Sequence, residues 1–383
     1  MTRTAWLRKS LLITAIGLGA LCVGTWRAEA GAYVQTNLVS DGFLPAELID
    51  PSLKNPWGVS HSDTSPFWTS NQGTSTASLF NVSVTPPVKN PTIAPSIPPG
   101  GAGAVGPTGQ VNNGNASSFL LTNGDGGSAR FIFANLNGTI SGWDGGAASV
   151  IQATTAGAVY TGLAINNAQT LLYAANGAQN RIDVFDHNFA NITSTTFVGK
   201  FVDPVLPAGL VPFNVQNIGG NIYVTYAPAG GRPNQIHVPE GNGAVAEFDA
   251  NGTFIKQIIS GSKLASPWGI ALAPGGFGEF GGDLLVGNFS FDASEINAFD
   301  PMTGAPIGTI PIDDGGAHGG LWALNFGTGG QNGSPNTLFF TDGVNGEADG
   351  LFAALTPAPE PSSLALLAAA FGLFAARRAR SRR

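Results

Sequence analysis

The feature that most constrains this chain is an internal repeat. An apolar strand, a turn, a second strand ending in Asn or Asp and then a third strand follow one another, most clearly in residues 160–186, YTGLAINNAQTLLYAANGAQNRIDVFD. The segments SPWGIALAP, GDLLVGNF and EINAFD between residues 266 and 300 have the same three parts. Successive copies begin roughly 45 to 60 residues apart, and such a period of short strands is typical of a radial array of small sheets.

Six copies of the repeat are found, which predicts an all-β, six-bladed β-propeller. The predicted first strands are 57–60, 118–122, 161–165, 212–217, 268–273 and 321–326. The predicted second strands are 66–70, 129–134, 170–175, 221–226, 283–287 and 336–341. The predicted third strands are 77–82, 138–144, 181–186, 244–249, 295–300 and 350–355.

The last copy lacks an outer strand, because its third strand runs into the C-terminal tail. Residues 33–39, YVQTNLV, form an isolated strand pattern, so we expect them to pair with the last blade and close the ring; a free N-terminal arm is the alternative. Residues 84–115 are dense in Pro and Gly, and we expect a long loop in which only a few residues form the outer strand of the first blade. A solvent-facing insertion and a lid are both open for this loop.

The N-terminus carries the pattern of an export signal. Arg3, Arg8 and Lys9 precede an apolar stretch over 11–23, and Ala28-Glu29-Ala30 offers a cleavage site. We therefore expect a signal peptide over 1–30 and a propeller body over 31–357. The single cysteine, Cys22, lies inside the apolar stretch, so the mature chain is predicted to have no disulfide and no Cys-bound metal; a lipoprotein is the alternative.

The C-terminus, residues 358–383, has three parts. Pro359-Glu360-Pro361 is followed by an apolar run over 364–376 and by five arginines. This tail resembles the PEP-CTERM sorting signal of exported bacterial proteins. The resemblance implies a hydrophobic sorting helix, transient inner-membrane anchoring, processing by an exosortase after signal peptidase, and a surface-bound or released product. A permanent single-span anchor is the alternative.

The charge of the body excludes one class of partner. With both ends set aside, eight basic residues face twenty-two acidic ones, a difference of −14. Nucleic acids and anionic membranes are bound by clustered Lys and Arg, so neither is expected as a partner.

The repeats also resemble known families. GLAINNAQTLLYAANGAQNRIDVFD is similar to NHL-type repeats, in which a Gly-Ile-Ala strand, a Tyr-Val-Ala-Asp strand and an Arg-Ile-x-Val-Phe strand follow one another. Pieces such as NPWG, ARFIFAN, GTISGWD, PFNVQNIGG and GLWALNFG resemble an uncharacterised family of exported, often PEP-CTERM-tailed bacterial proteins. This second resemblance implies a six-bladed propeller and export, and no established activity. The chain departs from that family most over 232–240, RPNQIHVPE.

The candidate binding site is one mouth of the central channel. In propellers, the loop after each second strand and the loop entering each first strand lie on the same face. Side chains placed there are expected to bind a ligand: Trp57, Asn71, Asn135, Asn176, Trp268, Asn288, Trp322 and Asp342. Amides and indoles suit polyhydroxylated molecules. The alternatives are that the Asn and Asp side chains are turn residues and that the tryptophans pack the blades.

An enzymatic function has weaker support. Some six-bladed propellers are calcium-dependent lactonases, and Asp342, Glu347, Asn176 and Asn288 supply oxygen ligands of the type that calcium prefers. The four histidines are dispersed, and only His318, near Asp313 and Asp314, is placed near the channel mouth. We therefore expect a non-catalytic binding or matrix module for extracellular polysaccharide or an envelope protein. A calcium-dependent lactonase-like hydrolase and a purely structural disc are the alternatives.

Overall fold

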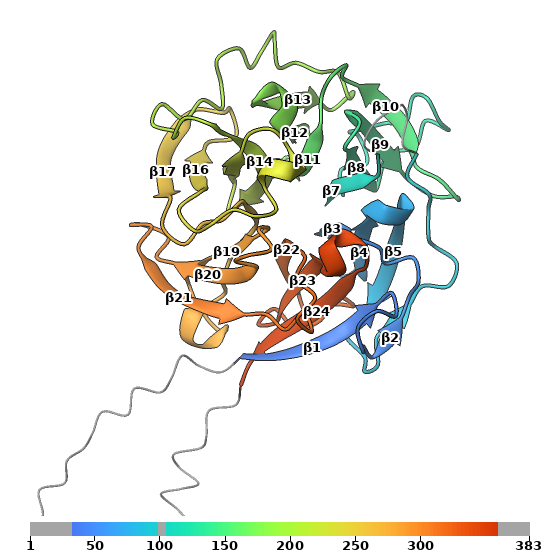
Figure 1. Cartoon of the computed structure of the whole chain (residues 1–383). Coiled ribbons are helices and arrows are strands. Elements are labelled where there is room, and N and C mark those ends of the chain that lie inside the picture. Colours follow the sequence, from blue (N-terminus) through green and yellow to red (C-terminus); the bar gives the residue numbers. More distant parts are fainter. Residues whose placement is uncertain (1–32, 99–104, 359–383) are drawn as a thin grey trace, which may run out of the picture.

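The protein folds into six antiparallel sheets arranged around a central axis (Figure 1). The structure is a computed structural model that describes residues 33–98 and 105–358. The prediction of six blades is confirmed. The predicted signal peptide, the Pro-Glu-Pro motif and the sorting helix lie outside the described residues.

Each blade is built from strands that run outward from the axis in chain order. Blade 1 contains β3 (Pro56–Ser60), β4 (Phe67–Asn71), β5 (Thr76–Asn81) and β6 (Val88–Lys89), and blade 2 contains β7 (Pro107–Asn112), β8 (Phe131–Asn135), β9 (Thr139–Trp143) and β10 (Val150–Thr154). Blade 3 contains β11 (Tyr160–Ile165), β12 (Leu171–Asn176) and β13 (Arg181–Asp186), and blade 4 contains β14 (Leu210–Ile218), β15 (Asn221–Pro228), β16 (Ala244–Phe248) and β17 (Phe254–Ser260). Blade 5 contains β18 (Pro267–Leu272), β19 (Leu284–Asn288), β20 (Glu295–Phe299) and β21 (Pro306–Pro311), and blade 6 contains β22 (Gly320–Phe326), β23 (Leu338–Gly343) and β24 (Leu351–Pro357).

Blade 6 is completed by the N-terminal segment, as predicted. The strand β1 (Tyr33–Ser40) pairs antiparallel with β24, with Tyr33 opposite Pro357 and Ser40 opposite Leu351. The short strand β2 (Leu48–Ile49) then adds to β1 in parallel. Figure 1 shows β1, in blue, lying beside β24, in red. The two ends of the folded body therefore share one sheet, and β24 has no free edge.

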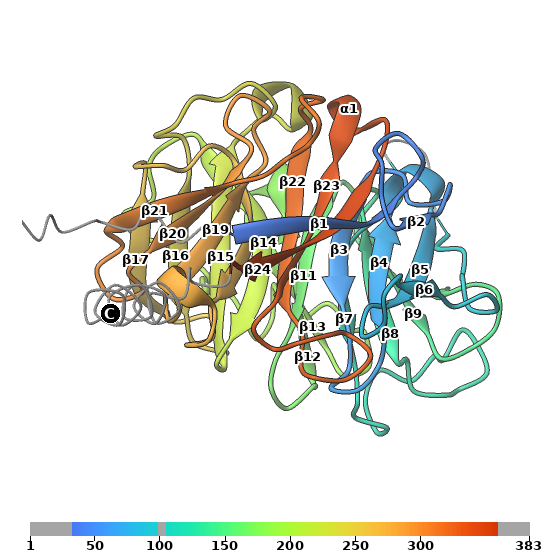
Figure 2. The same ribbon diagram turned by 90° about the horizontal axis from the view of Figure 1, so that it is seen from below.

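In the described part of the chain, helical structure is confined to short turns. The helix α1 (Val344–Glu347) lies in the loop after β23, at one face of the disc in the side view (Figure 2). The 3₁₀ turns are Gln72–Thr74, Gly177–Gln179, Arg232–Asn234 and Gly278–Phe280. Over residues 33–98 and 105–358, no helix is long and apolar enough to cross a bilayer.

The first strand of blade 2 is the one strand that was placed wrongly. The sequence prediction put it at 118–122, whereas the structure has β7 at Pro107–Asn112, inside the segment predicted to be a loop. Only β6 of that segment was anticipated, as the outer strand of blade 1. A proline can begin β7 because an innermost strand has a sheet neighbour on one side only. Residues 118–122 instead bury Phe119 and Leu121 against the blade.

Close contacts between innermost strands hold neighbouring blades together. A Cβ on Gly109 in β7 would lie 2.1 Å from the Leu163 amide nitrogen of blade 3, and one on Gly269 in β18 would lie 2.2 Å from the Trp322 carbonyl oxygen of blade 6. Glycine is therefore required where the inner strands approach most closely. Further out, apolar residues of adjacent blades pack face to face and form the rest of the core.

Candidate functional site

The Asn and Asp residues that end the second strands occupy equivalent positions. Each is paired with a residue at the start of the innermost strand of its own blade, the first residue in four blades and the second in blade 6: Pro56 with Asn71, Pro107 with Asn135, Tyr160 with Asn176, Pro267 with Asn288 and Leu321 with Asp342. In blade 4 this position holds Tyr226, opposite Pro212. All five Asn and Asp side chains are fully buried and lie inside the blades.

Three of these side chains form hydrogen bonds within their own blade. Asn71 donates to Ser78 Oγ at 3.0 Å, and Asn176 donates to Asp183 Oδ2 at 2.8 Å. Asn288 accepts from the Ala265 amide and donates to the Lys263 carbonyl, both at 2.9 Å. Asn71 and Asn176 thus bond to the third strand of their blades, whereas Asn288 bonds to the loop before β18, and none of the three lines the channel pocket described below.

The other two members of the set, Asn135 and Asp342, have no hydrogen-bond partner within the described part of the chain. For Asp342 this has an electrostatic consequence. Burial, together with the nearby Asp314 and Glu347 carboxylates, raises the pKa of Asp342 to about 8. Its carboxyl group is therefore neutral through most of the physiological pH range.

The channel is blocked by five aromatic side chains, which we call the aromatic floor: Trp57, Phe213, Trp268, Phe289 and Trp322. Trp57 stacks on Trp322 with ring centroids 3.5 Å apart, and Phe289 stacks on the same indole at 4.4 Å. Trp268 meets both indoles edge-on, at 6.2 and 5.6 Å. The structure thus brings the three predicted tryptophans together, as a packed layer across the channel.

The indole nitrogens of the aromatic floor differ in their partners. Trp322 Nε1 donates to Asn55 Oδ1 at 2.9 Å, and Trp268 Nε1 donates to the Thr161 carbonyl at 2.8 Å. Trp57 Nε1 is buried and makes no hydrogen bond to any described residue. The floor therefore presents one unused donor next to the pocket that Trp57 lines.

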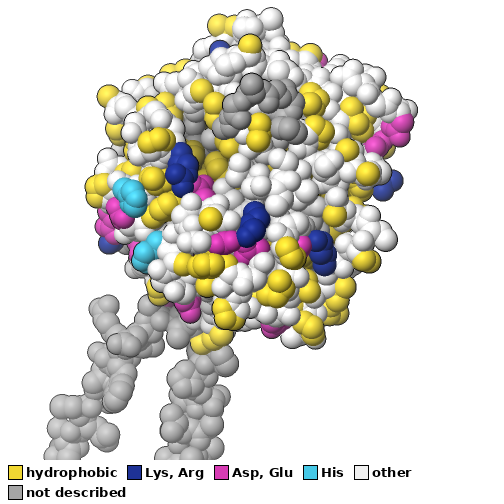
Figure 3. Space-filling model, turned by 45° about the vertical axis from the view of Figure 1, so that its right-hand side comes forward, with side chains coloured by type: hydrophobic (Ala, Val, Ile, Leu, Met, Phe, Trp, Pro, Cys, Tyr) yellow, Lys and Arg dark blue, Asp and Glu magenta, His cyan; other side chains and the backbone are white. Residues whose placement is uncertain are grey.

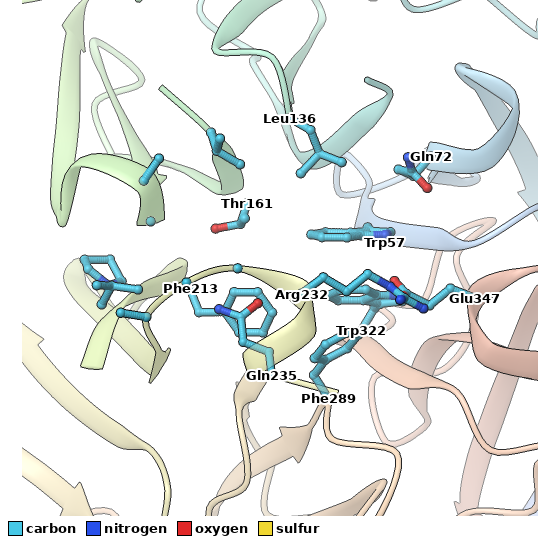
Figure 4. Close-up of a pocket in the computed structure, with 18 of the residues that line it drawn as sticks. Trp57, Gln72, Leu136, Thr161, Phe213, Arg232, Gln235, Phe289, Trp322 and Glu347 are labelled. Atoms are coloured by element: carbon cyan, nitrogen blue, oxygen red, sulfur yellow. The ribbon is translucent and has the colours of Figure 1, made fainter. Parts of the chain in front are cut away.

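Above the aromatic floor lies a pocket of about 880 Å³, the upper pocket. Its walls come from loops that enter first strands and loops that follow second strands. These loops lie on the face where the sequence analysis placed the candidate site. Trp57, Phe213, Phe289 and Trp322 form its base, and its polar side chains are Asn55, Gln72, Thr161, Asn180, Arg232, Gln235 and Glu347. Figure 4 labels most of these groups, among them Gln72, Arg232 and Glu347, and shows them converging from different blades. The volume and the mixture of an apolar base with a few polar groups are typical of small-molecule sites.

An ion pair crosses one side of the upper pocket. Arg232, from the loop between β15 and β16, pairs with Glu347 of α1, and its Nη2 donates to the Gly346 carbonyl at 3.0 Å. The guanidinium also lies 5.8 Å from the centre of the Phe291 ring in blade 5. This arginine therefore connects the loops of blade 4 and blade 6 and lies near Phe291 in the loop after β19 of blade 5.

The two members of the ion pair are unequally buried. The Arg232 side chain is half exposed, whereas only 7% of the Glu347 side chain is exposed. Burial raises the pKa of Glu347, against the lowering effects of the Arg232 charge and of a hydrogen bond from Asn55. The guanidinium is thus the more accessible charge for a ligand in the pocket.

The residues predicted to hold calcium do not share one wall. Glu347 lines the upper pocket, whereas Asp342, Asn176 and Asn288 do not, and the amides of Asn176 and Asn288 are already hydrogen-bonded. Across the described ranges, no three His, Cys, Asp or Glu side chains gather as a metal site. His318 is exposed, 3.0 Å from Asp314, and borders a separate depression with Phe291 and Glu295.

Sequence reasoning missed Arg232, Gln72 and Gln235 as pocket residues. Arg232 opens the segment 232–240, where the chain departs most from the family that its repeats resemble, and the glycines before it, Gly230 and Gly231, adopt positive φ angles of 98° and 72°. That departure was the available signal. Its partner Glu347 lies 115 residues further along the chain, and no spacing rule connects the two.

The molecular surface agrees with the low charge of the sequence. Figure 3 shows charged side chains as isolated spots on a mostly uncharged face. No broad basic area is visible on the face drawn in Figure 3.

Comparisons with known proteins extend the description. No family model matches the chain. The uncharacterized protein L690 of Acanthamoeba polyphaga mimivirus is 30% identical over 302 residues, which cover 74% of this chain and 77% of that protein. The uncharacterized protein R648 of the same virus is 31% identical over 331 residues, 82% of this chain and 78% of that protein.

Solved structures show a similar fold. A protein of unknown function from Bacteroides thetaiotaomicron superposes with a TM-score of 0.50 at 10% identity, over 85% of this chain and 76% of that one. At such identity the likeness concerns the fold alone. From the sequence similarity, the chain belongs to the family of the mimivirus proteins L690 and R648.

Proposed function

We propose that this protein is an exported, non-catalytic binding module whose upper pocket receives the end of a glycan. The observation that carries the proposal is the combination of an aromatic base with a charged pair and several amides at the wall. Aromatic rings favour the C–H faces of sugars, while Arg, Glu and amide groups bind hydroxyls. The pocket volume of about 880 Å³ exceeds the lower limit for ligand sites, about 300 Å³.

The role of the wall residues follows from their accessibility. Gln235 donates its amide to the Pro228 carbonyl at 3.0 Å, so its Oε1 is available to accept from a ligand hydroxyl. Arg232 is half exposed and has donors beyond those used with Glu347 and Gly346. Trp57 Nε1 adds a donor at the base, provided that the indole shifts slightly when the ligand enters.

A glycan array followed by calorimetry tests the proposal. Residues 31–357 are expected to retain at least one neutral or acidic glycan, and Arg232→Ala should weaken that binding by about tenfold or more, the value of a charge-assisted hydrogen bond. Lys200→Ala is the matched control, because Lys200 is an exposed cation on the far side of blade 4 whose Nζ lies 3.3 Å from Thr253 Oγ1. Absence of retained glycans, or equal binding by the Arg232→Ala variant, would contradict the proposal.

Export and sorting are part of the same proposal. The N-terminal signal pattern, the resemblance of the C-terminus to PEP-CTERM signals and that of the repeats to an exported bacterial family support a cell-surface or released protein, cut by signal peptidase near residue 30 and by an exosortase near residue 358. Mass spectrometry of the mature protein from hosts with and without an exosortase checks this. Identical C-termini from both hosts would contradict it.

A calcium-dependent lactonase-like hydrolase is the second candidate. Its supporting observation is the buried Asp342 carboxyl group, which has no partner among the described residues. The remaining ligands are not gathered there, so we place this candidate second and derive no reaction step from it. A rise in melting temperature with calcium that Asp342→Ala abolishes would reverse the order.

A further inference from the structure

A second cavity lies on the other side of the aromatic floor. This lower cavity has a volume of about 270 Å³, and a narrow extension of about 20 Å³ reaches the underside of Trp268. Both parts are lined by Val59, Gln110, Leu163, Gln216 and Asn325, which belong to the ends of five innermost strands. The upper pocket shares none of these residues.

One buried acceptor in the lower cavity is unused. The Gln110 amide donates from Nε2 to the Gly58 and Trp68 carbonyls, both at 2.8 Å. Two carbonyl acceptors fix the orientation of this amide, because a flipped amide would place Oε1 against both oxygens. Gln110 Oε1 is buried and has no hydrogen-bond partner among residues 33–98 and 105–358, although the residue is only 5% exposed.

A buried hydroxyl accompanies it. Ser60, at the end of β3, lines the same cavity, is 7% exposed, and its Oγ makes no hydrogen bond within the described chain. Leaving a buried polar atom unpaired costs about 1–3 kcal/mol. Two such atoms beside one cavity mark a place where a hydrogen-bonding molecule would be stabilised.

Further polar groups come from blades 4 and 6. No hydrogen bond of the Gln216 side chain to a described residue is found, and Asn325 Nδ2 has only a 3.5 Å contact with the Val59 carbonyl. Asn325 Oδ1 lies 3.3 Å from His61 Nε2, which holds the amide at the cavity wall. Amides and a hydroxyl from four blades thus surround one small space.

The charge of the lining limits the chemistry of the ligand. No Lys, Arg or Glu lines the lower cavity, and Asp63, an exposed residue, is its one carboxylate. An anionic ligand would lose hydration without gaining a counter-charge, and a cationic one would meet only this exposed, hydrated carboxylate. Hydroxyl groups both donate and accept, so they match amides and serine. The volume is slightly below the range of about 300–1,000 Å³ for drug-sized ligands, which suits a single ring.

From these observations we propose that the lower cavity is a second binding site, separate from the upper pocket, for one neutral polyhydroxylated ring such as a monosaccharide or a cyclitol. Its hydroxyls donate to Gln110 Oε1 and exchange hydrogen bonds with Ser60, Gln216 and Asn325.

Saturation-transfer NMR and calorimetry with glucose, galactose and myo-inositol test the proposal on the whole mature protein. At least one neutral probe is expected to bind saturably, and glucuronate and glucosamine are expected to bind at least about tenfold more weakly. Failure of all neutral probes to bind, or tighter binding of the charged ones, would overturn the proposal.

Three variants separate the lower cavity from the upper pocket. Ser60→Ala and Gln216→Leu should each reduce the affinity for the best neutral probe by about tenfold, the equivalent of one hydrogen bond. Neither should lower the melting temperature, because neither side chain bonds another described residue. Arg232→Ala, in the upper pocket, should leave this affinity unchanged. Loss of binding in Arg232→Ala alone would place the probe in the upper pocket and overturn the proposal.

Discussion

Blades 5 and 6 lie side by side, follow the same plan, and differ in the features that decide stability and binding. In blade 5 all four strands are consecutive in the chain, and both the oxygen and the nitrogen of the Asn288 amide are hydrogen-bonded. In blade 6 the fourth strand comes from the N-terminus, and Asp342, at the equivalent position, is buried without a partner in the described chain. The repeat therefore specifies the backbone, while substitutions at equivalent positions give a blade its own chemistry.

The largest difference between the two blades should appear when the outer strand is removed. A chain lacking residues 33–47 exposes the whole edge of β24 and removes Val39 from the core, so we expect loss of the cooperative thermal transition and aggregation. Circular dichroism and light scattering measure this. The matched control lacks residues 1–32 only and should melt like the full body. A cooperative transition in the shorter chain would show that ring closure is dispensable.

Exchanging the amide and the acid should have the next largest effect. The folded-state pKa of Asp342, about 8, lies above its ordinary value near 4, so the folded protein holds this proton more tightly than the unfolded chain. The contribution of Asp342 to stability is then most favourable below about pH 4 and falls as the pH rises to about 8, by up to about 1.4 kcal/mol per pH unit. Asp342→Asn should remove this slope and raise stability at pH 7 by as much as about 4 kcal/mol.

Urea unfolding at several pH values checks this expectation, with Asn288→Asp as the reverse control in blade 5. That variant loses the donation to the Lys263 carbonyl and should be destabilised increasingly at higher pH. Equal pH profiles for the native protein and Asp342→Asn would show that Asp342 is paired in solution.

A smaller effect is expected where the two blades touch. Gly269 of blade 5 has no room for a Cβ beside the Trp322 carbonyl, whereas blade 6 carries Ala323 at the corresponding place. Gly269→Ala should destabilise by about 1–3 kcal/mol through overpacking, and Ala323→Gly by about 1 kcal/mol. Chemical denaturation distinguishes them. If Gly269→Ala left the free energy of unfolding unchanged, the blades would be able to move apart at this contact without a loss of stability.

The smallest change in stability is expected at the ion pair that passes over blade 5 to reach blade 6. Arg232 is half exposed, so Arg232→Ala should cost less than about 1 kcal/mol at low pH. At low pH the Glu347 carboxyl can take up a proton, because its pKa is raised. The loss of stability caused by Arg232→Ala should grow as the pH rises, because the variant then buries an unpaired Glu347 carboxylate. Thermal melts at pH 5 and pH 8 measure it. The double variant Arg232→Ala, Glu347→Gln should lose the pH dependence; if it does not, another group is responsible.

Much of the fold could be predicted because each blade repeats one local pattern. All six third strands and the closing strand β1 were placed correctly, since their alternation and turns are local properties. The strand β7 was missed because Pro and Gly around it indicated a loop. Pro107-Thr108-Gly109 nevertheless matches Pro56-Trp57-Gly58 and Pro267-Trp268-Gly269, so alignment of the repeats contained the signal.

The candidate site could be predicted only in its position. The face on which the sequence analysis placed the site does hold the upper pocket. The Asn side chains at the ends of the second strands point into the blades instead, and for Asn288 this orientation depends on hydrogen bonds with the loop 263–265. The contacts between Arg232 and Glu347, and between Gln110 and blade 1, join residues far apart in sequence. Only the assembled ring brings them together.

The pairing of Tyr33 with Pro357 has a geometric consequence for how the molecule is presented. Both ends of the body leave from one point on the outer rim of blade 6, away from the axis (Figure 1). A tether at either end would hold the disc by its rim and not by one of its faces. The two openings of the channel would then face sideways into the medium, both accessible at once to different molecules.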